Sequence, residues 1–141
     1  MAARLIIMLK FPRPGAVKTR LTGALGDRRA CELYRALVRH TLAAVECFAA
    51  RGEVAVEARV VGAPDDAAAR AWLGSAMTIR DQGDGDLGER MERAVRSAFT
   101  EGAEAVVVIG GDCPQLTAEH LAAAFTALAR TDAVLGPAAD G

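Results

Sequence analysis

The sequence predicts an α/β fold, in which a mainly parallel sheet carries helices on both faces. Residues 5–9 and 105–109 are continuous apolar runs, as expected for parallel strands that are buried on both faces. Segments with helical periodicity alternate with these strands, without internal repeats, low-complexity stretches or a linker. The chain has 141 residues, 52% of them hydrophobic, so a single α/β domain is expected over residues 1–141.

The N-terminal half predicts a strand, a loop, a long helix and a second strand. Two prolines and a glycine exclude regular structure from residues 10–18. Asp27 can cap a helix that runs to about residue 50. The apolar residues of this helix recur at three- and four-residue steps and predict one buried face: Ala30, Leu33, Tyr34, Leu37, Val38, Leu42, Val45 and Phe48. Residues 54–61 alternate with period two, which predicts a strand nearer to an edge of the sheet.

The middle of the chain predicts two helices on either side of a weak strand signal. Pro64 opens a short helix that carries Trp72, which we expect in the core, and residues 77–79 give the strand signal. Asp86 begins the second helix. Its buried stripe is predicted at the following positions: Leu87, Met91, Ala94, Val95, Ala98 and Phe99.

The C-terminal part predicts one more helix and a last strand. Thr117 caps the helix, and residues 133–135 form the strand. Ligands of such sheets bind beyond the carboxyl ends of the strands. Function is therefore expected in the loops that follow residues 9, 79, 109 and 135.

Composition and charge exclude several classes of protein. The chain has 17 Lys and Arg against 18 Asp and Glu, and this balance argues against a nucleic-acid-binding surface. No stretch approaches the roughly 18 apolar residues of a membrane helix, and the first apolar run is too short for a secretory signal. Cys31, Cys47 and Cys113 are far apart and odd in number, which indicates a reducing cytoplasm without disulfides or a zinc site.

The loop after the first strand carries four cations, Lys10, Arg13, Lys18 and Arg20, around Gly15. Arginine offers a planar fork of donors and lysine a mobile charge, and both suit phosphate oxygens. A glycine lets the backbone approach a ligand closely. The segment is neither a Walker A motif nor G-x-G-x-x-G. The positive charge of this loop is consistent both with a phosphate-binding site and with a basic loop that is exposed to solvent.

The loop after residues 105–109 carries Asp112. A carboxylate at this place can hold a hard divalent cation that bridges the phosphates of a nucleotide. The alternative is a helix cap, but Thr117 is better placed for that role. Cys113 lacks a partner that could activate it as a nucleophile, because neither His40 nor His120 is suitably placed, and a small buried cysteine is favoured.

A third loop leads from Gln82 into the helix that begins at Asp86. The amide of Gln82 carries a donor and an acceptor and could read the edge of a nucleobase. Gly85 makes the loop pliant, and Gly88 costs helix stability in a way that suggests close approach of a ligand. The alternative is an acidic, well-capped helix start, which composition alone favours.

Four segments together resemble one known family. They are residues 11–21, 85–91, 108–114 and 135–141, and their content and order are similar to the DUF2064 family, also named selenodomain-associated transferase 1. That family resembles 2-phospholactate guanylyltransferases and, more broadly, enzymes of the glycosyltransferase-A (GT-A) type. The resemblance covers the whole chain, and it implies a GT-A-like, Rossmann-type three-layer sandwich.

The resemblance also implies roles for site residues. Lys18 and Arg20 match the phosphate-binding loop of related nucleotidyltransferases, and residues 82–88 match the segment that contacts the base. Asp112 matches an aspartate that binds Mg²⁺ or Mn²⁺ and, with Lys18 and Arg20, is expected to support catalysis. Asp140 matches an aspartate near the metal or the acceptor, and we expect it as a second metal ligand.

Two departures from the family pattern carry expectations of their own. Gly111 stands where relatives usually have Thr, Ser or Ala, which is expected to loosen the Asp112 loop. Family members continue past Asp140-Gly141 into further strands and another acidic ligand, so the C-terminal, acceptor-binding part is expected to be missing here. The last strand would then be an open edge, which favours a homodimer.

The function expected is that of a cytoplasmic, metal-dependent transferase. It would take a nucleoside triphosphate or a nucleotide sugar and transfer the nucleotidyl or glycosyl group to a small-molecule acceptor. Nucleic acid and membranes are not expected as partners. The alternative is a non-catalytic nucleotide-binding module, or an inactive truncated fragment that self-associates.

Overall fold

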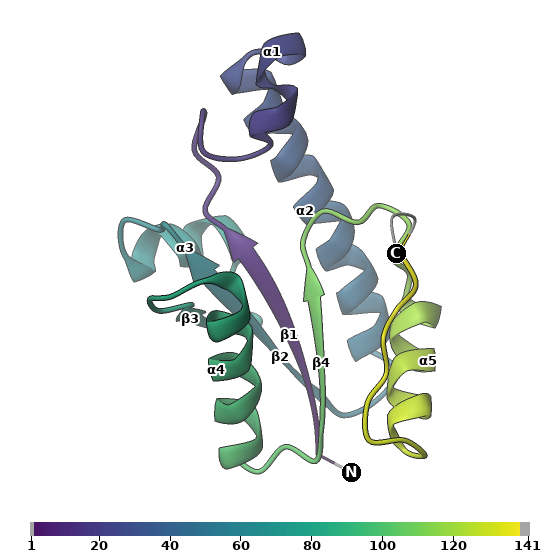
Figure 1. Ribbon diagram of the computed structural model, residues 1–141. Helices are drawn as coiled ribbons and strands as arrows, with labels where there is room; N and C mark the ends of the chain where they lie inside the picture. Colours follow the sequence, from purple (N-terminus) through teal and green to yellow (C-terminus); the bar gives the residue numbers. More distant parts are fainter. Residues whose placement is uncertain (1, 139–141) are drawn as a thin grey trace.

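A parallel sheet forms the middle layer of the structure, a computed structural model that describes residues 2–138 (Figure 1). Within these residues the strands lie in the order β3-β2-β1-β4, and all neighbours are parallel. The strands are β1 (Ala3–Lys10), β2 (Val54–Val61), β3 (Thr78–Asp81) and β4 (Ala105–Gly110). The helices are η1 (Thr19–Leu21), α1 (Thr22–Leu25), α2 (Asp27–Ala49), α3 (Asp66–Leu73), α4 (Leu87–Thr100) and α5 (Ala118–Leu128). The predicted alternation of strands and helices is confirmed.

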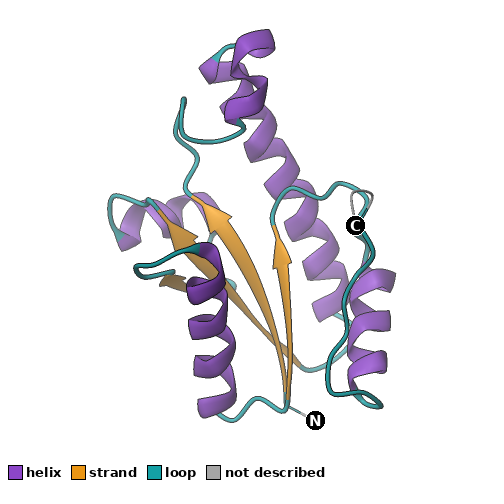
Figure 2. Ribbon diagram, viewed as in Figure 1, coloured by secondary structure: helices purple, strands orange, loops and turns teal. Residues whose placement is uncertain are grey.

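Helices cover both faces of the sheet (Figure 2). Leu5, Ile7 and Leu9 of β1 belong to the larger apolar core, which includes side chains of α2, α3 and α5. Ile6 points to the opposite face, because side chains alternate along a strand, and packs against two alanines of α4. The predicted three-layer arrangement is therefore confirmed.

The long helix α2 supplies most of the helical side of the larger core. Tyr34, Val38 and Val45 are buried on its inner face, as predicted. Leu33 is 38% exposed, so its predicted place in that face is wrong. Asp27 is the first residue of the helix and makes no side-chain cap, since Gly26 occupies the N-cap position. Thr117 and Asp86, by contrast, cap α5 and α4 as predicted.

β2 corrects the prediction of a strand near the sheet edge, because it lies between β1 and β3. Its alternation places Glu57 and Arg59 on the α4 face, where both are buried. Glu57 accepts hydrogen bonds from Arg4 of β1 at 2.7 Å and from Arg59 beside it. Buried charges are tolerated only when paired, and this pairing explains how charged residues enter an interior strand.

The apolar stripe predicted on α4 is only partly buried. Ala94 and Ala98 are 1% exposed and let the helix lie close to the sheet, whereas Leu87, Met91 and Phe99 are 55%, 38% and 49% exposed. The prediction that these three are buried is wrong. The larger side chains project from the flank of the helix beside the alanines, where they stay partly open to solvent.

The predicted last strand at residues 133–135 is not formed. This segment follows α5 without regular structure, and Leu135 is 94% exposed. A strand needs a ladder of hydrogen bonds to a neighbour, and β4 pairs only with β1 within the described residues. Asp140 lies outside the described residues. No helix within residues 2–138 has the length and apolar character that a membrane crossing requires.

Candidate functional site

Two of the predicted site residues meet at the carboxyl end of the sheet. Lys18 follows β1 and Asp112 follows β4, and the two strands are neighbours, so their loops emerge side by side (Figure 1). Lys18 Nζ lies 2.8 Å from Asp112 Oδ2. The side chains are 25% and 49% exposed, so the pair is open to solvent and to a ligand. Residues from two separate sequence motifs therefore form one site.

The loop that carries Asp112 is held tightly against β1 and α2. Gly111 is buried, and a Cβ atom there would come within 2.2 Å of Leu9 Cδ2. Thr41 Oγ1 lies 3.0 Å from the carbonyl oxygens of both Gly111 and Leu37, which share its one proton, and His40 Nε2 lies 2.9 Å from the carbonyl oxygen of Pro114. The prediction that Gly111 loosens this loop is wrong, because the missing side chain is what allows the close packing.

Thr41 and His40 are site residues that the sequence motifs did not reveal. Thr41 is fully buried and lies at helical spacing from Val38 and Val45 on the inner face of α2. A polar residue on a buried helix face needs a hydrogen-bond partner. The carbonyl of Leu37 in the same helix is one such partner, so the position of Thr41 in the sequence could not by itself have revealed the contact with the loop.

The loop before Lys18 is shaped by a glycine and a buried valine. Gly15 has a φ of +82°, and a Cβ atom there would lie 3.3 Å from Asp27 Oδ2. Val17 is 3% exposed and anchors the loop in the larger core. Lys18 itself has a φ of 51°, which makes it the one non-glycine residue with positive φ in residues 2–138. The chain thus adopts an uncommon conformation at the residue that reaches Asp112.

The other cations of this loop are exposed. Lys10, Arg13 and Arg20 make no ion pair within residues 2–138, which leaves them available to an anion. Arg13 lies 5.9 Å above the ring of Phe11. The backbone of Lys10 is fixed by Tyr34, whose hydroxyl accepts from the Lys10 amide and donates to its carbonyl. Burial is the main reason that the pKa of Tyr34 is raised to about 12, so this hydroxyl stays protonated.

Gln82 does not have the role that the sequence suggested. Its side chain is buried, and Nε2 donates to the carbonyls of Leu9 at 2.8 Å and Arg59 at 2.9 Å. Its Oε1 accepts from Arg90 at 2.7 Å. Because both amide donors and the acceptor are used, the side chain cannot read a base edge in this arrangement. It ties β1 and β2 to the start of α4 instead.

The segment between Gln82 and α4 is a well-capped helix start, as the alternative interpretation proposed. Asp86 and Glu89 form a reciprocal capping box, and the hydrogen bond from the Glu89 backbone is the main cause of the lowered pKa of Asp86. Arg93 donates to the carbonyls of Gln82 and Asp84 and holds the loop from the helix side. Gly85 has a φ of +104°, a conformation that favours glycine. The backbone alone therefore accounts for a glycine here, and close approach of a ligand is not needed to explain it.

Gly88 lies in the first turn of α4, as predicted. A Cβ atom there would lie 3.4 Å from Asp86 Oδ1, which is close to an ordinary contact, so packing within the chain does not require a glycine at this position. Residues 83–89 are exposed, and their backbone remains open to a ligand.

Asp112 belongs to no larger cluster of metal-binding side chains within the part of the chain that the structure describes. Residues 2–138 contain no group of three or more His, Cys, Asp or Glu able to hold a metal ion. A single carboxylate still suits Mg²⁺, which is commonly bound by one or two carboxylates together with water and phosphate oxygens. Cys113 is exposed, which corrects the expectation of a buried cysteine. The residues present therefore fit a metal that arrives with a phosphate ligand.

The family can now be identified from a match that covers most of the chain. The model of the DUF2064 family, described as an uncharacterized protein conserved in bacteria, matches residues 41–141. The chain belongs to the DUF2064 family. That match includes Asp112 and the start of α4, while the Lys18 loop precedes it.

Two relatives of this DUF2064 protein cover the Lys18 loop as well. A phosphoenolpyruvate guanylyltransferase of Chloroflexus aggregans is 30% identical over 133 residues, which are 93% of this chain and 64% of the relative. A solved structure from Desulfovibrio desulfuricans G20, provisionally assigned as a nucleotide-diphospho-sugar transferase, is 36% identical with a TM-score of 0.88. It is matched by 100% of this chain, which covers 61% of that structure. The predicted class of fold is confirmed, and the chain spans somewhat less than two thirds of both relatives.

Proposed function

We propose that this DUF2064 protein is a metal-dependent transferase whose donor is a nucleoside triphosphate or a nucleotide sugar. The observation that carries the proposal is the meeting of Lys18 and Asp112, 2.8 Å apart, at the carboxyl end of a parallel sheet. Relatives named as a guanylyltransferase and a nucleotide-diphospho-sugar transferase support the same class of donor. The acceptor is a small molecule, and the reaction is nucleotidyl or glycosyl transfer.

In this proposal the residues of the site act mainly through charge. Lys18 and Arg20 bind phosphate oxygens of the donor and stabilise the negative charge that grows as the bond to phosphorus or sugar breaks. Lys10 and Arg13 extend the positive surface along the same loop. Asp112 would hold Mg²⁺ or Mn²⁺, which supplies Lewis-acid stabilisation of the phosphates when bound. Asp140 remains a candidate second ligand.

Base recognition is assigned to the backbone rather than to a glutamine side chain. Gln82 is occupied by Leu9, Arg59 and Arg90. The exposed backbone around Gly85 offers donors and acceptors next to a helix N-terminus. The guanylyltransferase relative favours a guanine nucleotide as the donor.

The experiment is a thermal-stability panel of GTP, CTP, ATP, UTP, UDP-sugars and GDP-sugars, each with and without Mn²⁺. A ligand at about 100 times its Kd stabilises the folded state by roughly 2.7 kcal/mol, which is visible as a higher Tm. We expect a shift that needs both Mn²⁺ and one class of nucleotide. A panel without any metal-dependent shift would contradict the proposed donor.

The second candidate is a nucleotide-binding module that does not catalyse transfer. It is favoured by the lone carboxylate at the site, since residues 2–138 hold no larger acidic or histidine cluster. Product formation by this chain alone, followed by mass spectrometry with small hydroxyl or phosphate acceptors, would exclude it. The cytoplasm is the proposed location for either function, in line with the free state of Cys31, Cys47 and Cys113.

A further inference from the structure

We infer that Lys18 and a divalent cation exclude each other at Asp112, so that the arrival of metal and nucleotide transfers the Lys18 ammonium group from the carboxylate to a phosphate. This inference rests on the proposed function. It adds a coupling between two ligands, which the roles of the separate residues do not contain.

The first argument is that the ammonium group already stands where a cation would bind. Lys18 Nζ is 2.8 Å from Asp112 Oδ2. Mg²⁺ binds oxygen at about 2.1 Å. A metal ion and the ammonium group on the same carboxylate would therefore place like charges only a few ångströms apart, and no larger acidic cluster in residues 2–138 offsets that repulsion.

The second argument is that only one member of the pair is free to move. The backbone on either side of Asp112 is fixed, because Gly111 is held by Thr41 and Pro114 lies against His40. The side chain of Lys18 has a long flexible stem, so its ammonium group can leave Asp112 while its backbone, between buried Val17 and the 3-10 helix η1, stays in place. A metal ion at Asp112 therefore displaces the lysine rather than the carboxylate.

The third argument is that either ligand on its own meets a residue whose charge the ion pair has already neutralised. Without metal, Asp112 neutralises Lys18 and weakens its attraction for phosphate. Without nucleotide, Lys18 neutralises Asp112 and weakens its attraction for metal. When both ligands bind, each charge finds a new partner, so metal and nucleotide should bind cooperatively.

The first test measures Mn²⁺ binding in the absence of nucleotide, by the electron paramagnetic resonance signal of free Mn²⁺. Lys18→Met should bind Mn²⁺ roughly three- to fivefold more tightly than the wild type, the range expected for an exposed ion pair. Arg51→Met is the matched control, because Arg51 also pairs with an exposed carboxylate, Glu119, and should leave Mn²⁺ affinity unchanged. Equal or weaker Mn²⁺ binding by Lys18→Met would overturn the inference.

The second test follows the lysine itself. Lys10 and Lys18 are the lysines of the chain, so ¹³Cε labelling of lysine gives two resolvable NMR signals. Addition of Mg²⁺ should move the Lys18 signal toward its position in Asp112→Asn and leave the Lys10 signal in place. A Lys18 signal that stays fixed at Mg²⁺ concentrations that saturate Lys18→Met would overturn the displacement.

Failure of the inference and failure of the proposed function give different results. If nucleotide and metal stabilise the wild type together but Lys18→Met binds Mn²⁺ no more tightly, the inference alone falls. If neither metal nor nucleotide binds any variant, the proposed function falls and the inference falls with it.

Discussion

At the scale of single residues, buried residues determine where exposed site residues lie. Asp112 owes its place to Gly111 beneath it and to Thr41, which holds the Gly111 carbonyl. Gln82 shows the opposite case, in which a residue suited to ligand recognition is used entirely inside the protein. Sequence patterns reveal the type of a residue but not how many of its hydrogen-bonding groups the fold has already used.

Gly111→Ala tests the close packing of the Asp112 loop. The added Cβ atom would come within 2.2 Å of Leu9 Cδ2 and 3.3 Å of Val38 Cγ2. Overpacking of this kind lowers the free energy of unfolding by about 1–3 kcal/mol. Urea denaturation measures it, with Gly23→Ala as the control, since a Cβ atom at Gly23 meets nothing within 4 Å. Equal stabilities of wild type and Gly111→Ala would show that the loop is not tightly packed.

Glu101 gives a prediction for the dependence of stability on pH. A hydrogen bond from Arg80, with further ones from Ser97 and Arg4, lowers the pKa of Glu101 to about 2 in the folded protein, below its ordinary value of 4.5. The carboxylate therefore stabilises the fold above pH 4.5, and this contribution is lost as the pH falls toward 2. Glu101→Gln should lose less stability than the wild type over that interval, as measured by Tm. Parallel loss in both proteins would contradict the prediction.

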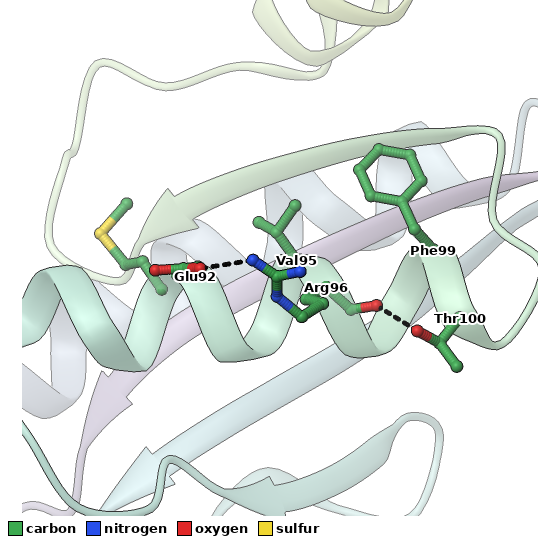
Figure 3. A pocket seen from close by; sticks show the side chains of 6 residues that line it. Glu92, Val95, Arg96, Phe99 and Thr100 are labelled. Carbon is green, nitrogen blue, oxygen red and sulfur yellow. Dashed lines mark hydrogen bonds and ion pairs between the residues drawn. The ribbon is translucent and has the colours of Figure 1, made fainter.

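At the scale of elements, the buried and exposed sides of α4 differ in the size of their apolar side chains. α4 faces the sheet with alanines. Val95 and Phe99, which are larger and apolar, project from the flank of the helix (Figure 3). There, Val95 and Phe99 line a shallow groove beside the Glu92–Arg96 ion pair. The apolar periodicity of α4 predicted a buried stripe because periodicity reports which residues share a side, and not how far the neighbouring layer extends.

Substitutions on the two sides of α4 should differ in their effect on stability. Phe99→Ser should lower the free energy of unfolding by about 1 kcal/mol, because the side chain is 49% exposed and only half of its burial is lost. Ala98→Leu should lower it by about 1–3 kcal/mol, because this alanine is 1% exposed against the sheet. Chemical denaturation of both variants measures the contrast. A loss in Phe99→Ser larger than that in Ala98→Leu would contradict the contrast.

At the scale of the whole molecule, the layers and the place of the site could be predicted from the sequence. The extent of the sheet and the charged pairs inside it could not. The apolar run of β1 predicted an interior strand correctly, whereas β4, predicted from a similar run to be buried on both faces, is the outermost strand within residues 2–138 and is mostly half-buried. The rule that ligands bind beyond carboxyl strand ends directed attention to Lys18 and Asp112. Residues 133–135 failed as a strand because a strand depends on a neighbour that no local pattern reveals. Glu57 and Arg59 are tolerated in the interior because Glu57 pairs both with Arg59 beside it and with Arg4, which is distant in sequence.

The homodimer expected from the sequence stays a prediction at this scale. The surface open to it is the outer edge of β4, which pairs with no strand within residues 2–138, together with the exposed side chains of α4. Sedimentation equilibrium of the wild type and of Phe99→Glu measures it. A monomeric wild type at all concentrations would contradict it.

The most direct measurement is a calorimetric titration of GTP with Mg²⁺ into the wild type and into Asp112→Asn. Glu119→Gln is the control, because it alters an exposed carboxylate in another ion pair. If Asp112 holds the metal that bridges to the nucleotide, the wild type and Glu119→Gln bind GTP more tightly with Mg²⁺ than without it. Asp112→Asn should then lose at least about tenfold in affinity, which is about 1.4 kcal/mol, and its residual binding should not respond to Mg²⁺. Unchanged, Mg²⁺-dependent binding by Asp112→Asn would contradict the assignment of this site.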